Sequence, residues 1–130
     1  MKKIIFLFLA ATLTICSCDE PIGKWDDNIK LSQKNVELKG TEDSVIITTK
    51  GDSWWLNSIL FDGSWFFCDA IGSNGLSYKI QEDDFIIEKR DKNTLFIKLS
   101  ENETEAVRTM TITLQAGNYF DYINIKQSAK

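Results

Sequence analysis

Residues 108–127 read RTMTITLQAGNYFDYINIKQ, and this stretch decides the fold. In its first half the apolar residues Met110, Ile112 and Leu114 alternate with threonines, and a similar alternation returns in its second half. A period of two places one side of a strand against a core and leaves the other side in solvent. Gly117-Asn118 separates the halves and has the composition of a two-residue turn. The stretch therefore predicts a tight hairpin from Arg108 to Gln127.

The chain on either side of this hairpin, from Ile29 onward, reads as further strands separated by turns. Residues 44–49 are β-branched almost throughout, and apolar residues alternate with others from Leu95 to Leu99. The turn segments between such runs are Gly51-Asp52, Asp62-Gly63, Gly72-Ser73-Asn74-Gly75 and Asp91-Lys92-Asn93. No stretch has sustained helical spacing. The pattern predicts an all-β fold over residues 29–130, an antiparallel β-sandwich of about seven to eight strands.

The N-terminus has the layout of an export signal. Lys2 and Lys3 precede an apolar stretch over residues 4–15, which is shorter than the roughly 20 residues that a membrane-spanning helix needs. The sequence Ile15-Cys16-Ser17-Cys18 then resembles the lipobox of bacterial lipoproteins. Cys16 is the rival acceptor, but the small residue Ser17 before Cys18 fits the signal peptidase better than the bulky Ile15 before Cys16. We therefore predict a signal peptide over residues 1–17 and lipidation at Cys18.

A short tether over residues 18–28 would join this lipid anchor to the sandwich. Asp19-Glu20, directly after the cysteine, is similar to signals that carry Bacteroidetes-type lipoproteins to the outer face of the outer membrane. The same acidic pair is equally compatible with a solvated linker. The expected location is the cell envelope, as an outer-membrane lipoprotein. It is exposed on the cell surface if Asp19-Glu20 acts as an export signal, and this pair leaves the question open if it is only a linker.

Removal of the signal peptide changes the charge and the cysteine count. The chain has 15 basic and 19 acidic residues, and the loss of Lys2 and Lys3 takes the net charge from −4 to −6. Such an acidic protein is poorly suited to bind nucleic acid, whose phosphates require a basic surface. Cys68 is the one thiol left after lipidation, so no disulfide can form within the mature chain. Its aromatic neighbours Trp65-Phe66-Phe67 predict that it is buried.

The C-terminal third carries a resemblance to a known family. The order of segments here resembles the end of a BACON domain, which usually has an Asn-rich turn, an arginine, an alternating strand, a hairpin and a last strand closing on glutamine. In this chain the matching segments are the stretch 102–107, which begins with Asn102, then Arg108, the hairpin and the last strand ending on Gln127. This family is named as Bacteroidetes-associated, carbohydrate-binding and often N-terminal. The pair Trp54-Trp55 is similar to the family's tryptophan at the start of its third strand. The resemblance covers roughly residues 29–127 and implies an immunoglobulin-like β-sandwich that binds carbohydrate.

The composition argues against catalysis. The chain has no histidine, which removes Ser-His-Asp and Cys-His arrangements and most zinc sites. The carboxylate pairs Glu42-Asp43 and Asp83-Asp84 are candidates for glycosidase chemistry. Adjacent residues on a strand point to opposite faces, however, so neither pair can close on a glycosidic bond by itself. We expect no enzyme activity, no cofactor and no metal.

Aromatic residues supply the remaining functional signal. Trp54, Trp55, Trp65 and Tyr78 are the candidate residues for binding a glycan or an envelope partner, because flat aromatic rings stack on sugars and anchor interfaces. Core packing is the alternative for each of them, and one of the adjacent Trp54 and Trp55 must face the core. Phe120 and Tyr122 lie opposite the apolar face of the last strand and are expected to be exposed.

Two classes of function therefore remain from the sequence. The first is a non-catalytic binding module, tethered to the membrane by its lipid, that contacts a polysaccharide or another envelope protein. The second is a structural accessory or spacer lipoprotein with no ligand of its own. The fold by itself does not separate them, because function depends on particular sites.

Overall fold

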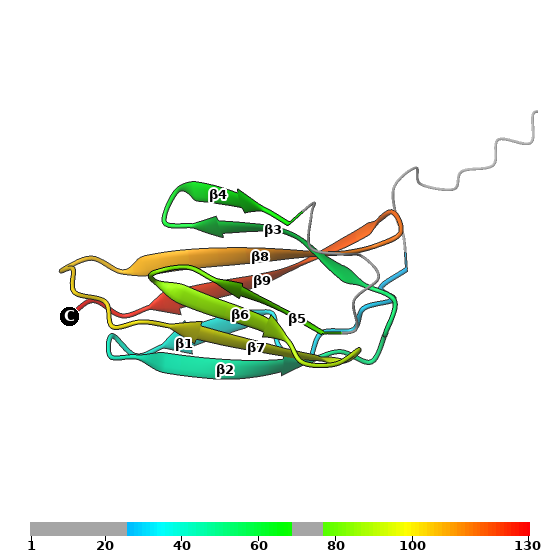
Figure 1. Ribbon diagram of the computed structural model, residues 1–130, viewed down its shortest axis with the longest axis horizontal. Coiled ribbons are helices and arrows are strands. Elements are labelled where there is room, and N and C mark those ends of the chain that lie inside the picture. The colour runs from blue at the N-terminus through cyan, green and yellow to red at the C-terminus, as the bar shows by residue number, and fades with distance from the viewer. Residues whose placement is uncertain (1–25, 69–76) are drawn as a thin grey trace, which may run out of the picture.

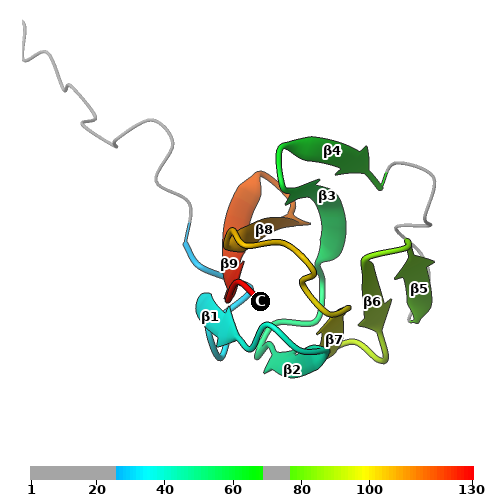
Figure 2. The same cartoon turned by 90° about the vertical axis from the view of Figure 1, so that its left-hand side faces the viewer.

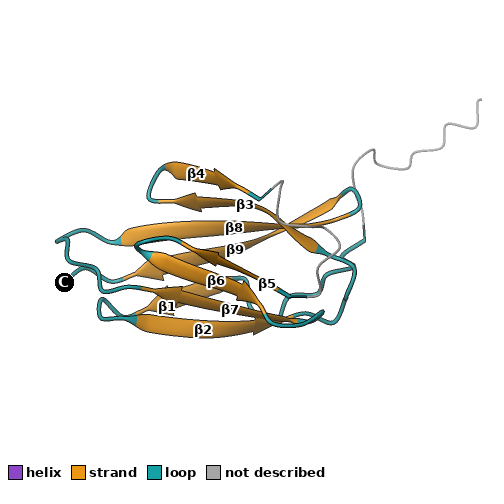
Figure 3. Ribbon diagram, in the orientation of Figure 1, coloured by secondary structure: helices purple, strands orange, loops and turns teal. Residues whose placement is uncertain are grey.

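The computed structural model describes residues 26–68 and 77–130 (Figure 1). The predicted signal peptide, Cys18 and most of the tether over residues 18–28 lie outside these ranges. Within the described part of the chain, all regular structure is β-strand (Figure 3). No helix there is long and apolar enough to cross a membrane.

Nine strands form two sheets. The strands are β1 (Asn35–Leu38), β2 (Asp43–Thr48), β3 (Trp55–Phe61), β4 (Ser64–Phe67), β5 (Tyr78–Gln81), β6 (Phe85–Lys89), β7 (Thr94–Leu99), β8 (Arg108–Ala116) and β9 (Tyr119–Gln127). The five-stranded sheet has the order β1-β9-β8-β3-β4, and the four-stranded sheet has the order β2-β7-β6-β5. Figure 2 shows the two sheets face to face.

This arrangement confirms the predicted β-sandwich and gives it the topology of immunoglobulin-like domains. The central strands β3, β8 and β9 correspond to the C, F and G strands of such domains, and β2, β7 and β6 to the B, E and D strands. The structure has nine strands, more than the seven to eight expected from sequence. Strands β1, β4 and β5 have four residues each, and strands this short give little alternation in the sequence. The sandwich is also not purely antiparallel, since β1 pairs with β9 in parallel.

The structure confirms the predicted hairpin and its two ends, Arg108 and Gln127. β8 pairs with β9 from Arg108 opposite Gln127 to Ala116 opposite Tyr119. Gly117 has a φ of +61°, as the first position of a two-residue type II′ turn requires. This turn and the start of the described chain, drawn in blue, lie at one end of the sandwich, and the C-terminus lies at the other end (Figure 1).

The core fills the space between the two sheets. Its largest fully buried side chains are Ile29, Ile47, Ile59, Ile87, Leu95, Ile97, Leu99, Met110, Ile112, Leu114, Ile123 and Ile125. They come mainly from the inner faces of the strands, as the period-two alternation predicts. Cys68 is buried, which confirms the expectation for its thiol. Because Ile29 is the first core residue among the described ones, a fragment of residues 19–130 contains every described side chain of the core.

Candidate functional site

Trp54 is a core residue and not a surface residue. It is 3% exposed, and its indole Nε1 donates a hydrogen bond to Thr49 Oγ1 at 2.9 Å. Lys89 Nζ lies 4.0 Å from the centre of the indole ring and donates to the Trp54 carbonyl at 2.9 Å. The expectation that one of Trp54 and Trp55 faces the core is therefore confirmed. The prediction that Trp54 takes part in an exposed binding strip is wrong, because protein atoms cover its ring.

Tyr78 is held in place by the fold as well. It lies on β5, in the four-stranded sheet, and packs half-buried against the core. Its hydroxyl accepts a hydrogen bond from the backbone N–H of Leu56 at 3.1 Å, which links the two sheets. Burial raises the pKa of Tyr78 to about 12. Tyr78 therefore does not lie beside Trp65, and its prediction as an exposed binding residue is wrong.

Lys89 beside Trp54 gives a prediction for the pH dependence of stability. Burial lowers the pKa of Lys89 below its usual value of 10.5, because the charged ammonium is poorly solvated there. The unfolded chain therefore binds this proton more tightly, and stability rises as the pH increases through the folded pKa toward 10.5. Relative to a Lys89→Met variant, the wild-type protein should gain stability between neutral pH and pH 10. Urea unfolding of both proteins at several pH values measures this, and a constant difference would contradict it.

Trp55 and Trp65 both lie on the outer face of the five-stranded sheet, in different rows of paired residues. Trp55 pairs with Gln115 of β8, which pairs in turn with Phe120 of β9. Trp65 of β4 pairs with Leu60 of β3. Residues that pair across neighbouring strands point to the same side of a sheet, so Trp55, Trp65 and Phe120 share one face. An irregularity between Leu56 and Ser58 in β3 lets both Trp55 and Leu60 face outward on this strand.

A second row of residues crosses the same face. Phe67 of β4 pairs with Ser58 of β3, Ser58 pairs with Thr113 of β8, and Thr113 pairs with Tyr122 of β9. Ser58 and Thr113 are small and buried although they point outward, because larger side chains flank them. The row therefore has an exposed aromatic ring at each end and two hydroxyl-bearing residues between them.

We call this surface the aromatic face, defined by Trp55, Trp65, Phe67, Phe120 and Tyr122. Trp65 and Phe67 are 57% and 70% exposed, and their rings stack at 5.9 Å with 10° between their planes. Phe120 and Tyr122 are 43% and 48% exposed, which confirms the expectation for this pair. Trp55 is partly exposed.

The aromatic face carries little charge for so acidic a protein. Among its strand residues only Glu37 of β1 and Lys126 of β9 are charged, and these two are paired neighbours. The outer face of the four-stranded sheet differs, since its strands present Lys79, Glu88 and Lys98. The aromatic face is therefore a surface of aromatic rings, hydroxyls and amides.

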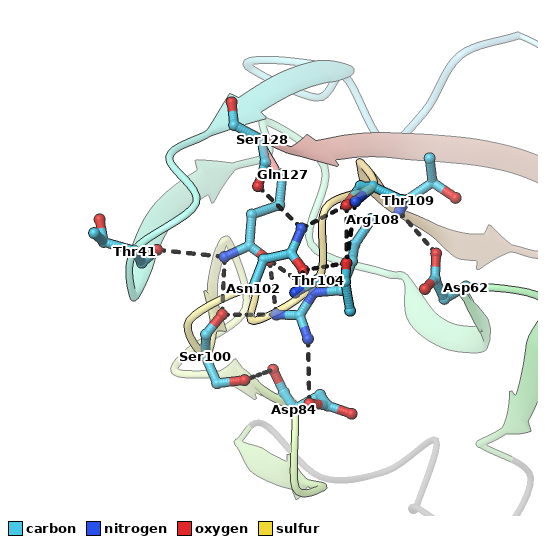
Figure 4. A network of polar contacts seen from close by, with 11 residues as sticks. Thr41, Asp62, Asp84, Ser100, Asn102, Thr104, Arg108, Thr109, Gln127 and Ser128 are labelled. Atoms are coloured by element: carbon cyan, nitrogen blue, oxygen red, sulfur yellow. Dashed lines mark hydrogen bonds and ion pairs between the residues drawn. The ribbon is translucent and has the colours of Figure 1, made fainter. Parts of the chain in front are cut away.

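A cleft of about 640 Å³ lies at the end of the sandwich that holds the C-terminus. Its lining residues are Phe61, Asp62, Ser64, Phe66, Asp84, Ser100, Glu101, Glu103, Thr104 and Arg108. The guanidinium of Arg108 is already bound by the protein (Figure 4). Nε and Nη2 donate to Gln127 Oε1 at 2.9 and 2.7 Å, Nη2 also donates to the Ser100 carbonyl at 2.7 Å, and Nη1 donates to Asp84 at 3.2 Å.

The same network contains the residues that carry the BACON resemblance. Gln127 is fully buried and donates to the carbonyls of Ser100 and Thr41. Asn102 is fully buried as well, donates to two carbonyls and accepts from Thr104 (Figure 4). These side chains tie the ends of strands and loops together, so their role in the structure is to hold the fold.

One carboxylate of each candidate pair, Asp43 and Asp84, is engaged in local structure. The Asp43 carboxylate accepts backbone N–H groups of Lys39 and Ser44, and the Lys39 bond holds the pKa of Asp43 below its usual range. Asp84 binds Arg108, as described above. Among residues 26–68 and 77–130, no group of three or more histidine, cysteine or acidic side chains is arranged to hold a metal ion.

Comparisons with known proteins agree with the fold. No protein-family model matches the chain, and no curated protein matches it. Among solved structures, the chain is similar to an NMR structure of a protein from Bacteroides thetaiotaomicron. The two share 24% sequence identity with a TM-score of 0.64, over 88% of this chain and 98% of that chain. A similarity at this level of identity shows the fold alone.

Four of the five residues of the aromatic face are predicted from the sequence, but not as one surface. Trp55 and Trp65 are candidate binding residues, and Phe120 and Tyr122 are expected to be exposed. Phe67 is not among the four candidate binding residues taken from the sequence. The signal for Phe67 is present in the sequence, because Asp62-Gly63 is a typical hairpin turn and alternation after it places Trp65 and Phe67 on one side and Phe66 on the other. In the structure Phe66 packs inward on Phe85, with ring centres 5.3 Å apart.

Proposed function

We propose that the chain is a non-catalytic lipoprotein of the cell envelope whose β-sandwich binds a glycan through the aromatic face. The observation that carries this proposal is the gathering of five aromatic side chains on one sheet face of low charge. Exposed aromatic patches of this kind mark binding surfaces on soluble domains. Hydroxyl and amide groups beside the rings, among them Asn124, can hydrogen-bond sugar hydroxyls, whereas the amide of Gln115 is already bonded to Asn57 and to the Gly117 carbonyl. The BACON resemblance favours the same class of ligand.

A lipid anchor at Cys18 would hold the end of the sandwich near residue 26 close to the membrane. The aromatic face runs along the side of the sandwich, so it would stay accessible in this orientation. A Cys18→Ser variant should no longer take up radiolabelled palmitate and should accumulate unprocessed or leave the membrane fraction. Continued labelling of this variant, with loss of label in Cys16→Ser instead, would falsify the assignment.

Affinity electrophoresis of the 19–130 fragment in gels that contain soluble neutral polysaccharides tests the glycan proposal. A β-glucan, a xylan, a mannan and a starch are suitable probes. Retardation by at least one of them is expected, because an aromatic ring stacked on a sugar contributes on the order of 1 kcal/mol. Trp65→Ala and Tyr122→Ala should each weaken binding about tenfold, which corresponds to about 1.4 kcal/mol.

Phe96→Ala is the matched control for these variants. Phe96 also lies on an outer sheet face, but on that of the four-stranded sheet, where the guanidinium of Arg90 covers its ring at 4.1 Å. Its removal should leave the retardation unchanged. If no polysaccharide retards the wild-type fragment, the glycan proposal fails and the structural accessory is favoured.

A further inference from the structure

Strand β4 differs from the other edge strands of the sandwich. The two sheets end in four edge strands, β1 and β4 in one sheet and β2 and β5 in the other. Three of them contain a charged residue: Glu37 in β1, Asp43 in β2 and Lys79 in β5. Charged side chains on edge strands discourage pairing with other chains. β4 has the sequence Ser-Trp-Phe-Phe and contains no charge.

The backbone of β4 offers hydrogen-bonding groups at this edge. Asp62 and Gly63 have φ angles of +48° and +87°, as in a two-residue type I′ turn, which makes Phe61 and Ser64 a hydrogen-bonded pair. Hydrogen bonding to the neighbouring strand then alternates along β4. The bond from Cys68 N–H to the Asn57 carbonyl, at 3.1 Å, fits this alternation. The N–H and C=O groups of Trp65 and Phe67 therefore point away from β3.

This pattern is complementary to itself about a two-fold axis. When two β4 strands pair antiparallel with Phe66 opposite Phe66, Trp65 of each copy lies opposite Phe67 of the other. Both residues carry outward-pointing backbone groups, so each Trp65–Phe67 pair can exchange two N–H···O bonds. Their side chains point to the outer face, where the rings of the two copies would meet as cross-strand aromatic pairs.

The charge distribution also fits contact between two copies at this edge. The whole protein is acidic, so two copies repel each other at most approaches. Along β4 no charge opposes contact. The nearest described acidic residue, Asp62, turns its carboxylate toward β8, where it accepts the N–H of Thr109 at 3.4 Å. An isologous contact through β4 therefore brings no like charges of the strand together.

We propose that β4 pairs with β4 of a second copy of this chain, so that two five-stranded sheets join into one continuous sheet. The dimer does not depend on whether the aromatic face binds a glycan. A contact through four residues per strand buries less than the roughly 1,600 Å² of a standard interface, so it is weak in dilute solution. Tethering of both copies to one membrane would raise their effective concentration.

Sedimentation equilibrium of the 19–130 fragment from micromolar to millimolar concentration tests the dimer. The wild-type fragment should shift from monomer toward dimer as concentration rises. The double variant Trp65→Lys/Phe67→Lys should stay monomeric, and lysine on an edge strand is compatible with the fold. The double variant Phe120→Lys/Tyr122→Lys makes the same charge change on the same face, but on β9, inside the sheet. It should dimerise like the wild type. A wild-type fragment that stays monomeric at millimolar concentration overturns the proposal, as does equal dimerisation of the two double variants.

A disulfide trap checks the register independently. Phe66→Cys in a Cys68→Ser background places the new thiols on the two-fold axis, in a pair without backbone hydrogen bonds where Cα atoms lie about 4.5 Å apart. Mild oxidation should give a covalent dimer on a non-reducing gel, and Ser64→Cys in the same background should give much less. Equal trapping at both positions, or none at Phe66→Cys in a variant whose circular dichroism shows that it is folded, contradicts the β4–β4 register. Glycan binding is measured separately, with Tyr122→Ala, which leaves β4 intact.

Discussion

Trp54→Ala is expected to lower the free energy of unfolding by about 3–5 kcal/mol, a large share of the stability of a domain of this size. The ring fills the core between the sheets, so its removal leaves a cavity. The variant also loses the hydrogen bond to Thr49 and the ring on which the buried ammonium of Lys89 rests. Lys89 would then keep its burial penalty with less compensation.

Trp65→Ala is the matched control, because it removes the same side chain from the aromatic face. Its indole is mostly exposed and contacts Phe67, so the loss of stability should stay below about 1 kcal/mol. Urea unfolding followed by circular dichroism measures both variants. Similar losses for the two would contradict the placement of Trp54 in the core and Trp65 on the surface.

The sequence predicts the parts of this fold that depend on local alternation. The β8–β9 hairpin repeats a two-residue period around a Gly-Asn turn, so its bounds and the exposure of Phe120 and Tyr122 follow directly. Local alternation does not predict which of Trp54 and Trp55 faces the core. It depends on how β3 pairs with β8 and on the irregularity after Leu56, and both are set by contacts between distant segments.

The aromatic face is likewise a product of topology. Trp55, Trp65 and Tyr122 come from β3, β4 and β9, and they share a face because β8 lies between β3 and β9. Tyr78 is close to Trp65 in sequence, but the chain crosses to the other sheet between them. Candidate binding residues chosen by their closeness in sequence therefore include Tyr78 and leave out Tyr122, although Tyr122 is the one that shares a face with Trp55 and Trp65. Buried polar residues such as Lys89 are also not predictable from composition, because their partners come from other strands.

Arg108→Met is expected to lower the free energy of unfolding by about 2–4 kcal/mol. The side chain provides both of the described hydrogen bonds to Gln127 Oε1, and that oxygen is buried. A buried acceptor left without a donor costs about 1–3 kcal/mol, and methionine does not replace the guanidinium that lies over the Phe61 ring. Asp84 should matter less, because its carboxylate is largely exposed to solvent.

A double-mutant cycle with Gln127→Met separates this structural role from ligand binding. Each single variant strands the polar group of its partner, whereas the double variant removes both groups together. The Ser100 carbonyl loses both of these donors in the double variant, but Ser100 is partly exposed and its carbonyl can bond water instead. The loss for the double variant should therefore be smaller than the two single losses combined by about 0.5–3 kcal/mol. The folded variants should also bind polysaccharide like the wild type, because Arg108 and Gln127 lie in the end network and not on the aromatic face. If Arg108→Met keeps full stability but loses glycan binding, the cleft at that end is the ligand site and the aromatic face is not. If both properties are unchanged, the network does not stabilise the fold as the geometry indicates.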